Sequence, residues 1–220
     1  MGLKIILTGA TGFVGEGVLL ECLNNNNVDK ILVIGRKGTG LTDSKIQELV
    51  VPNFFSLHGF EEQLKGYDAV FYCAGISSVG MQEAEYTKIT VDTPLAFAHK
   101  LLEVNPDMVF CHVSGLGTDA SEKGKVMWAR VKGRAENELA KLPFKKVYNF
   151  RPGFMKPTAG QQNVKTFYRI MGAMSGLMKL LFPKISGTVA QVGQAMINSV
   201  TKGYDKQVLE VADIKNLAAQ

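Results

Sequence analysis

The sequence predicts an α/β protein with a doubly wound parallel sheet, in which helices cover both faces of the strands. Short hydrophobic runs of strand length, each ending in small residues, recur along the chain. Segments with the apolar spacing of helices separate the later runs, and a glycine-rich turn follows the first one. Strands that lose their polar alternation are buried on both faces, which is typical of a parallel sheet between two layers of helices.

The elements follow in order from these patterns. The first strand is LKIILTG, residues 3–9, and the spacing of Val14, Val18, Leu19 and Cys22 predicts a helix over residues 12–26. Further strands are expected at residues 30–36, 53–59, 69–75, 107–115 and 146–153, with helices at about 81–104 and 122–142. The chain then continues with helices at about 163–182 and 188–201, the short strand QVLEV at 207–211 and a terminal helix.

Length and composition predict one domain. The 220 residues, 46% of them hydrophobic, suffice for one substantial core, and we expect residues 1–220 to form a single domain in which about 154–220 make a small C-terminal lobe. Cys22, Cys73 and Cys111 are spaced neither as a disulfide framework nor as a metal site, so we expect reduced thiols and a cytoplasmic protein without a metal. Gly and Thr interrupt the N-terminal apolar run before a signal peptide could form.

The positive charge is concentrated in one half of the chain. Residues 123–184 carry fourteen Lys and Arg against Glu136 and Glu138, which makes this segment +12 within a total of +5. The cations are scattered singly without interleaved aromatic residues, so a small phosphate-bearing ligand is favoured over nucleic acid.

The glycine-rich turn TGATGFVG predicts a dinucleotide site. Gly9 permits a tight turn, Gly12 lets backbone N–H groups approach a diphosphate, and Gly15 lets the helix pack closely on the strand. Such spacing is informative only between a strand and a helix, which is its predicted context here. The expected cofactor contacts in this turn are Gly9, Thr11, Gly12, Phe13, Val14 and Gly15.

The end of the second strand favours NADP over NAD. An acid about 20 residues beyond the glycines would bind the adenosine ribose of NAD. This chain has Arg36 and Lys37 there, which suit a 2′-phosphate, although a solvated charged turn is the alternative. The small residues Ala74 and Gly75 at the end of the strand at 69–75 would let the cofactor lie close to the sheet.

The turn TGATGFVG together with YCAG, HVSG, WARVKG and NFRPGFM resembles the short-chain dehydrogenase/reductase superfamily, whose fold is Rossmann-type. More narrowly, it is similar to the atypical branch that resembles nucleoside-diphosphate-sugar epimerases, and within it to the Tat-interacting oxidoreductase-like group. The resemblance implies an active site of a Ser and a Tyr four residues before a Lys. It assigns the first role to Ser114 and the last to Lys132, and it adds Pro152 and Gly153 to the cofactor contacts.

Two positions depart from this pattern. Trp128 occupies the place of the Tyr, and an indole N–H does not act as an acid at physiological pH, whereas a phenol can. The family also has an acid after the third strand that meets adenine, where LHGF offers Phe60.

Three functional interpretations follow. The first is an NADP(H)-dependent reductase of a quinone, flavin or other conjugated acceptor, with protons from solvent and Trp128 as a stacking platform. The second is an NADP(H)-sensing regulator without turnover. The third recruits Tyr86, Tyr168 or His112 as the proton donor. In the structural alternative, Trp128 is a core residue and Ser114 an ordinary serine at a strand end.

The methionine-rich segment FYRIMGAMSGLMKLLFP, residues 167–183, is too short and too charged for a membrane span. Core packing, a homodimer contact, a lid over an apolar acceptor and adhesion to a membrane surface remain its alternatives.

Overall fold

The computed structural model describes residues 2–55, 57–164, 182 and 184–220. Its main sheet has seven strands in the order β3-β2-β1-β4-β5-β6-β9, and every neighbouring pair is parallel. The chain order reverses at β1, which places a switch point between β1 and β4. This arrangement confirms the predicted Rossmann-type doubly wound sheet. The strands are β1 (Leu3–Thr8), β2 (Val28–Gly35), β3 (Ile46–Val50), β4 (Ala69–Tyr72), β5 (Val109–Val113), β6 (Lys146–Phe150) and β9 (Val208–Leu209).

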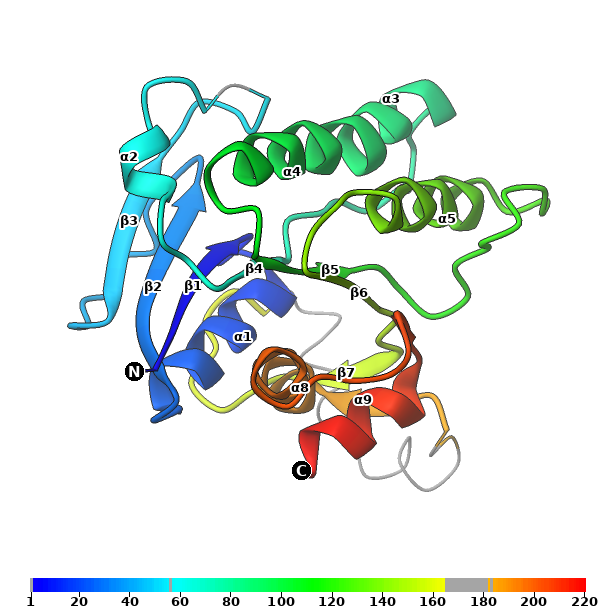
Figure 1. The fold of residues 1–220 in the computed structure, drawn as a ribbon. Coiled ribbons are helices and arrows are strands. Elements are labelled where there is room, and N and C mark those ends of the chain that lie inside the picture. Colours follow the sequence, from blue (N-terminus) through cyan, green and yellow to red (C-terminus); the bar gives the residue numbers. More distant parts are fainter. Residues whose placement is uncertain (1, 56, 165–181, 183) are drawn as a thin grey trace.

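Two layers of helices enclose the sheet (Figure 1). One layer contains α2 (Glu61–Leu64), α3 (Glu83–Thr87), the π-helix η1 (Lys88–Asp92), α4 (Thr93–Val104) and α5 (Met127–Ala140), and the other contains α1 (Phe13–Asn24), α8 (Val189–Thr201) and α9 (Val211–Ala218). Each layer packs its own hydrophobic cluster on the sheet, with Phe97 and Phe110 in the first and Leu19 and Met196 in the second.

The helix predicted at residues 81–104 contains a π-helical turn. Pro94 at the start of α4 has no N–H, so it cannot donate the usual helical hydrogen bond. The preceding N–H, that of Thr93, reaches back five residues to the carbonyl oxygen of Lys88, and the Thr93 hydroxyl donates to the same oxygen at 2.9 Å. The turn widens as a result, and the helix continues to Val104.

The third strand lies elsewhere than predicted. It is β3, Ile46–Val50, which pairs with β2 at the edge of the sheet, whereas residues 53–59 form no strand in the part that the structure describes. As an edge strand it is covered less completely, and Gln47, Glu48 and Val50 are exposed, so it lacks the continuous apolar run that marks the buried strands. The apolar residues Phe54 and Leu57 instead pack a loop against the core.

The C-terminal part adds a small parallel sheet of β7 (Phe154–Lys156) and β8 (Ser186–Thr188), which the sequence did not predict. The helix predicted at 188–201 and the terminal helix are present as α8 and α9, and reciprocal capping bonds join Thr188 with Gln191 and Glu210 with Asp213. The predicted helix at 163–182, with Tyr168 and the methionine-rich segment, falls almost entirely outside the described residues. Within the described part, no helix has the length and hydrophobicity needed to cross a bilayer.

Candidate functional site

The glycine-rich turn joins β1 to α1 at the switch point of the sheet. Gly9 has a φ of +74°, and a Cβ atom there would lie 2.6 Å from the carbonyl carbon of Cys73. At Gly15 a Cβ atom would lie 2.1 Å from the carbonyl oxygen of Gly9. A side chain at either position would therefore push the helix or β4 away from the turn.

The N-terminus of α1 opens toward solvent. Gly12 is its N-cap, and no side chain of the described residues caps the helix. Thr11 and Gly12 are exposed, whereas Phe13 and Val14 are half-buried. Because the first N–H groups of a helix carry partial positive charge, this end can hold an anionic group such as a diphosphate.

Arg36 and Lys37 follow β2 directly and are exposed. Neither forms an ion pair with a described residue, whereas the nearby carboxylate of Glu48 accepts hydrogen bonds from the backbone N–H and the hydroxyl of Thr39. The two cations at this strand end are therefore available to a negatively charged group.

The end of β4 leaves space beside the turn. The backbone N–H of Ala74 donates to the Thr8 hydroxyl at 3.2 Å, which ties β4 to the end of β1. Gly75 is exposed, and a Cβ atom there would meet nothing within 4 Å. No described side chain or backbone atom therefore fills the space beside Gly75.

The loop after β5 brings Ser114 and Lys132 together. Lys132 Nζ donates to the backbone carbonyl oxygen of Ser114 at 2.9 Å, rather than to its side chain. Burial lowers the pKa of the Lys132 amine, and the negative charge of Glu136 opposes that change. The Ser114 and Thr118 hydroxyl oxygens lie 3.0 Å apart, and Thr118 donates its own hydrogen to the carbonyl oxygen of Gly115. The hydrogen of the Ser114 hydroxyl is therefore directed at Thr118.

Trp128 lies in the first turn of α5, against the same loop. A Cβ atom at Gly117 would lie 3.5 Å from Cη2 of the indole, and a Cβ atom at Gly115 would lie 3.8 Å from Lys132 Nζ. The indole is half-buried and packs beside the cluster of Tyr86, Val91, Val131 and Ala135. Its N–H makes no hydrogen bond to a described residue. The ring therefore packs on this cluster and also lies against the loop after β5.

Two of the alternative proton donors are buried. Tyr86 is 2% exposed within the cluster beside Trp128, and burial raises the pKa of its phenol. His112 is 4% exposed in β5, with Nδ1 3.0 Å from Oδ1 of Asn149, and burial with the nearby charge of Lys132 lowers its pKa to about 4. The third candidate, Tyr168, lies outside the described residues.

A buried ion pair beneath the site was not predicted. Arg151, at the end of β6, donates to both carboxylate oxygens of Glu136 at 2.5 to 3.2 Å and to Glu210 at 3.0 Å. Glu136 is 2% exposed and lies one helical turn after Lys132. The only sequence signal was an acid four residues after a lysine on an apolar helix face.

Pro152 and Gly153 follow this arginine and meet the loop after β5. The Leu116 N–H donates to the carbonyl oxygen of Pro152 at 3.0 Å, and a Cβ atom at Gly153 would lie 3.3 Å from Leu116 Cδ2. The ends of β5 and β6 are thereby joined along the same edge of the sheet.

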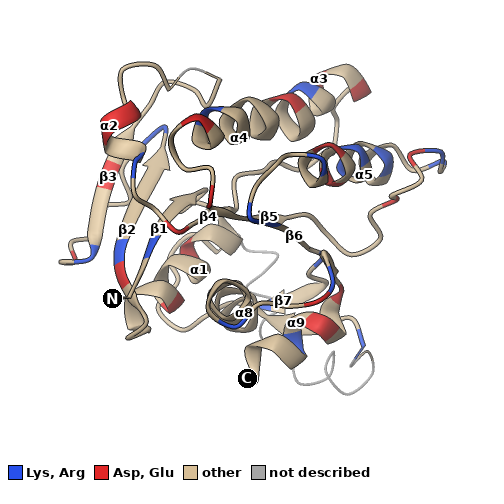
Figure 2. Ribbon diagram, in the orientation of Figure 1, with Lys and Arg blue, Asp and Glu red and all other residues tan. Residues whose placement is uncertain are grey.

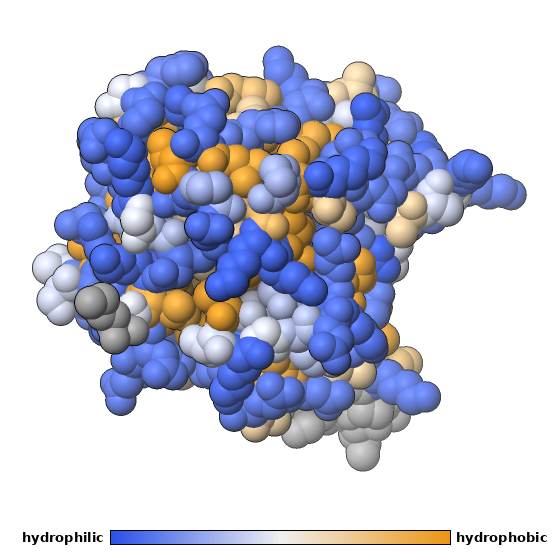
Figure 3. Space-filling view, in the orientation of Figure 1, coloured by the Kyte–Doolittle hydropathy of each residue, from blue (hydrophilic) through white to orange (hydrophobic). Residues whose placement is uncertain are grey.

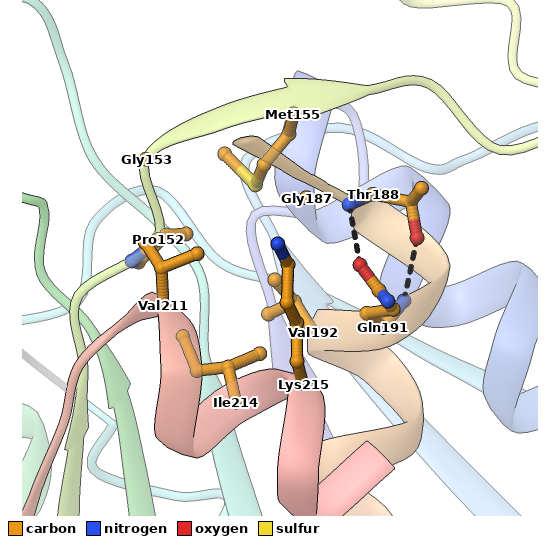
Figure 4. Close-up of a pocket in the computed structure, with 10 residues that line it drawn as sticks. All are labelled: Pro152, Gly153, Met155, Gly187, Thr188, Gln191, Val192, Val211, Ile214 and Lys215. Atoms are coloured by element: carbon orange, nitrogen blue, oxygen red, sulfur yellow. Dashed lines mark hydrogen bonds between the residues drawn. The ribbon is translucent and has the colours of Figure 1, made fainter. Parts of the chain in front are cut away.

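A small pocket lies on the other side of Pro152 and Gly153, between the β7-β8 sheet and helices α8 and α9 (Figure 4). Val192, Val211 and Ile214 line it, and its interior volume is about 10 Å³, which fits one water molecule at most. It is too small for a cofactor, and neither Lys132 nor Trp128 lines it.

Several cations of the basic segment lie on α5, including Arg130, Lys132 and Arg134, and Arg130 is paired with Glu83 (Figure 2). Within the described ranges, no group of three or more His, Cys, Asp or Glu side chains could hold a metal ion.

Comparisons with known proteins identify the family and the fold of the chain. The model of the NAD dependent epimerase/dehydratase family matches residues 5–132. The rat (Rattus norvegicus) Protein HTATIP2 is 26% identical over 154 residues, 69% of this chain and 62% of that protein. Leucinostatins biosynthesis cluster protein T of Purpureocillium lilacinum is 30% identical over 143 residues, 64% of this chain and 52% of that protein. The matched parts thus span less than two thirds of either relative.

A solved structure shows the same fold. The short chain dehydrogenase of Burkholderia cenocepacia J2315 in complex with NADP superposes with a TM-score of 0.65 at 14% identity, covering 99% of this chain and 92% of that one. The resemblance to short-chain dehydrogenases and to the Tat-interacting group is confirmed by these matches.

Proposed function

Because the chain belongs to the NAD dependent epimerase/dehydratase family, we propose that it is an NADP(H)-dependent reductase of a conjugated or apolar acceptor of the quinone or flavin type. The observation that carries this proposal is that Lys132 and Trp128 both lie against the loop after β5. These are the two positions where the family pattern has its lysine and its phenol.

The cofactor would lie across the switch point. The N-terminus of α1 at Gly12 would hold the diphosphate, and Arg36 and Lys37 would bind the 2′-phosphate. The absence of a side chain at Gly75 would leave room for the cofactor beside the sheet. Lys132 would bind the nicotinamide ribose, because the Ser114 carbonyl uses only one of its three N–H donors. The NADP named in the structure of the Burkholderia dehydrogenase supports this cofactor, as do the two cations after β2, which form no ion pair with a described residue.

The reaction would proceed without a residue of α5 that donates a proton to the acceptor. NADPH supplies a hydride when bound. An acceptor of this kind would take up that hydride together with a proton from solvent, with NADP⁺ and the reduced acceptor as the products. Trp128 cannot deliver the proton, and the hydroxyl hydrogen of Ser114 is directed at Thr118. An acceptor that needs enzymatic protonation, such as an unactivated aldehyde or ketone, would therefore react poorly.

Exposed hydrophobic side chains favour an apolar acceptor. Ile76, Leu116 and Phe154 follow β4, β5 and β6, respectively, and are 41%, 36% and 45% exposed. Carboxyl ends of parallel strands lie at one edge of a sheet, where α/β proteins bind their ligands. In Figure 3, hydrophobic surface shows between the helices above and below the sheet. Together with the indole of Trp128, these side chains would form an apolar wall for a flat ring system.

The alternative function is an NADP(H)-sensing regulator without turnover. The loop after β5 favours it, because the residues expected to contact the cofactor are present, while no described residue at this loop is placed to donate a proton to an acceptor. NADPH affinity measured by fluorescence, together with NADPH oxidation on a panel of quinones, flavins and aldehydes, separates the two. Turnover with quinones or flavins supports the reductase, and tight binding without turnover on any acceptor supports the regulator.

A further inference from the structure

Glu16 is a buried acid in the first turn of α1. It is 5% exposed, and its two carboxylate oxygens accept hydrogen bonds from the backbone N–H groups of Gln162 and Asn163, each at 2.7 Å. A carboxylate removed from water requires such partners. Almost 150 residues of chain separate the acid from its donors, so these bonds fasten a remote segment to the start of α1.

A second residue of that segment contacts the same helix turn. The Gln161 side chain donates from Nε2 to the carbonyl oxygen of Phe13 at 2.7 Å, and its Oε1 accepts from the backbone N–H of Thr158 at 2.6 Å. A Cβ atom at Gly17 would lie 2.8 Å from that Oε1, so α1 and the segment are in close contact. Residues 158–163, here called the docking segment, follow β7 and run beside α1 in Figure 1.

We propose that Glu16 couples dinucleotide binding to the attachment of the docking segment. The proposal rests on the function above, because it takes the turn before α1 as the diphosphate site. Two anionic groups at one helix end repel each other unless hydrogen-bond donors compensate one of them. With the segment attached, two N–H groups stabilise the Glu16 carboxylate, and with the segment detached its uncompensated charge opposes the diphosphate.

The coupling is reciprocal. A segment that favours cofactor binding is itself held more tightly once the cofactor is bound, and by the same factor. The docking segment begins just after β7, whose Phe154 belongs to the apolar wall proposed for the acceptor. Cofactor binding would therefore steady the acceptor side of the site, and the cofactor would bind before the acceptor.

A double-mutant cycle tests the coupling. Gln161→Ala removes the contact with Phe13 and weakens attachment, so we expect the Kd for NADPH to rise about five- to tenfold. In the Glu16→Gln background, where no charge opposes the diphosphate, the same change leaves the Kd unaltered. Hydrogen exchange of the Gln162 and Asn163 amides supplies the second readout: NADPH slows their exchange in the wild type and not in Glu16→Gln.

The chain offers two matched controls. Glu21→Gln removes a carboxylate from the same helix one to two turns later, and Thr158→Val removes a segment hydroxyl that is buried without a partner among the described residues. Neither change alters the coupling. If Gln161→Ala raises the Kd equally in both backgrounds, or NADPH leaves the exchange of both amides unchanged, Glu16 is only a structural contact and the inference is overturned. A wild type that binds no dinucleotide overturns the proposed function as well.

Discussion

Lys132 Nζ donates a hydrogen bond to the backbone carbonyl oxygen of Ser114 at 2.9 Å, so the amine of α5 is anchored to the loop that follows β5. Trp128, one turn earlier on the same helix, touches that loop at Gly117. This relationship fixes the lysine in place independently of the residue at position 128. Changing the indole is therefore the most informative substitution at the site.

Trp128→Tyr is expected to create carbonyl reductase activity. A phenol one turn before a buried amine can have its pKa lowered and can donate a proton, which typically accelerates a reaction about 10²- to 10⁴-fold. The measurement is NADPH oxidation with an aromatic aldehyde. Trp128→Phe is the control, since it gives a similar ring without a hydroxyl and should stay inactive. A tyrosine variant that folds, binds NADPH and gains no activity would show that Trp128 is a packing residue.

Arg36→Ala is expected to weaken NADPH binding while leaving NADH binding unchanged. Loss of a charge-assisted hydrogen bond to a phosphate costs about 1.5–3 kcal/mol, so the Kd for NADPH should rise about 10- to 100-fold. Both constants are obtained by fluorescence titration, with Arg134→Ala, an exposed arginine of α5, as the control. Equal affinity of the wild type for the two dinucleotides would remove the role given to Arg36.

The Glu136–Arg151 pair should stabilise the fold beneath the site. Arg151→Met leaves Glu136 buried without its partner, and breaking such a pair costs about 3–5 kcal/mol in the free energy of unfolding. The exposed pair of Lys141 and Glu138 is the control, and its loss should change stability by less than about 1 kcal/mol. Denaturant unfolding measures both. Similar costs at the two pairs would contradict the assigned burial.

His112 should make stability fall as the pH is lowered from about 6.5 to about 4. The folded protein keeps this imidazole neutral down to its lowered pKa of about 4, while the unfolded chain binds a proton near 6.5. The unfolded state therefore holds more protons in this window, and the loss reaches about 3 kcal/mol at its lower end. His112→Gln should flatten the profile between pH 5 and 6.5 and His99→Gln, at an exposed position, should not. An unchanged slope in His112→Gln would refute the assignment.

The sequence predicted most of the main sheet because buried parallel strands leave continuous hydrophobic runs. The prediction failed at β3, because the exposed Gln47 and Glu48 interrupt its hydrophobic run. The apolar residues of the next loop, including Phe54, have the composition of a buried strand. The strands β7 and β8 were missed because three-residue strands carry too little periodicity to recognise.

At the site, local spacing predicted the glycine turn and the relation of Trp128 to Lys132. It could not predict the partners of Glu16 or Arg151, since those contacts join residues far apart in the chain. The misplaced strand also affects the position that the resemblance assigns to the adenine contact. Because β3 ends at Val50, Phe60 lies ten residues beyond the third strand and not directly after it.

The ratio of quinone to aldehyde turnover by the wild-type protein, followed as NADPH oxidation at saturating cofactor, decides whether this site reduces acceptors without an enzymatic proton donor. We expect NADPH oxidation with quinones or flavins and none above background with aldehydes, because Trp128 supplies no proton. Efficient aldehyde reduction by the wild type would contradict it, as would failure of NADPH to bind.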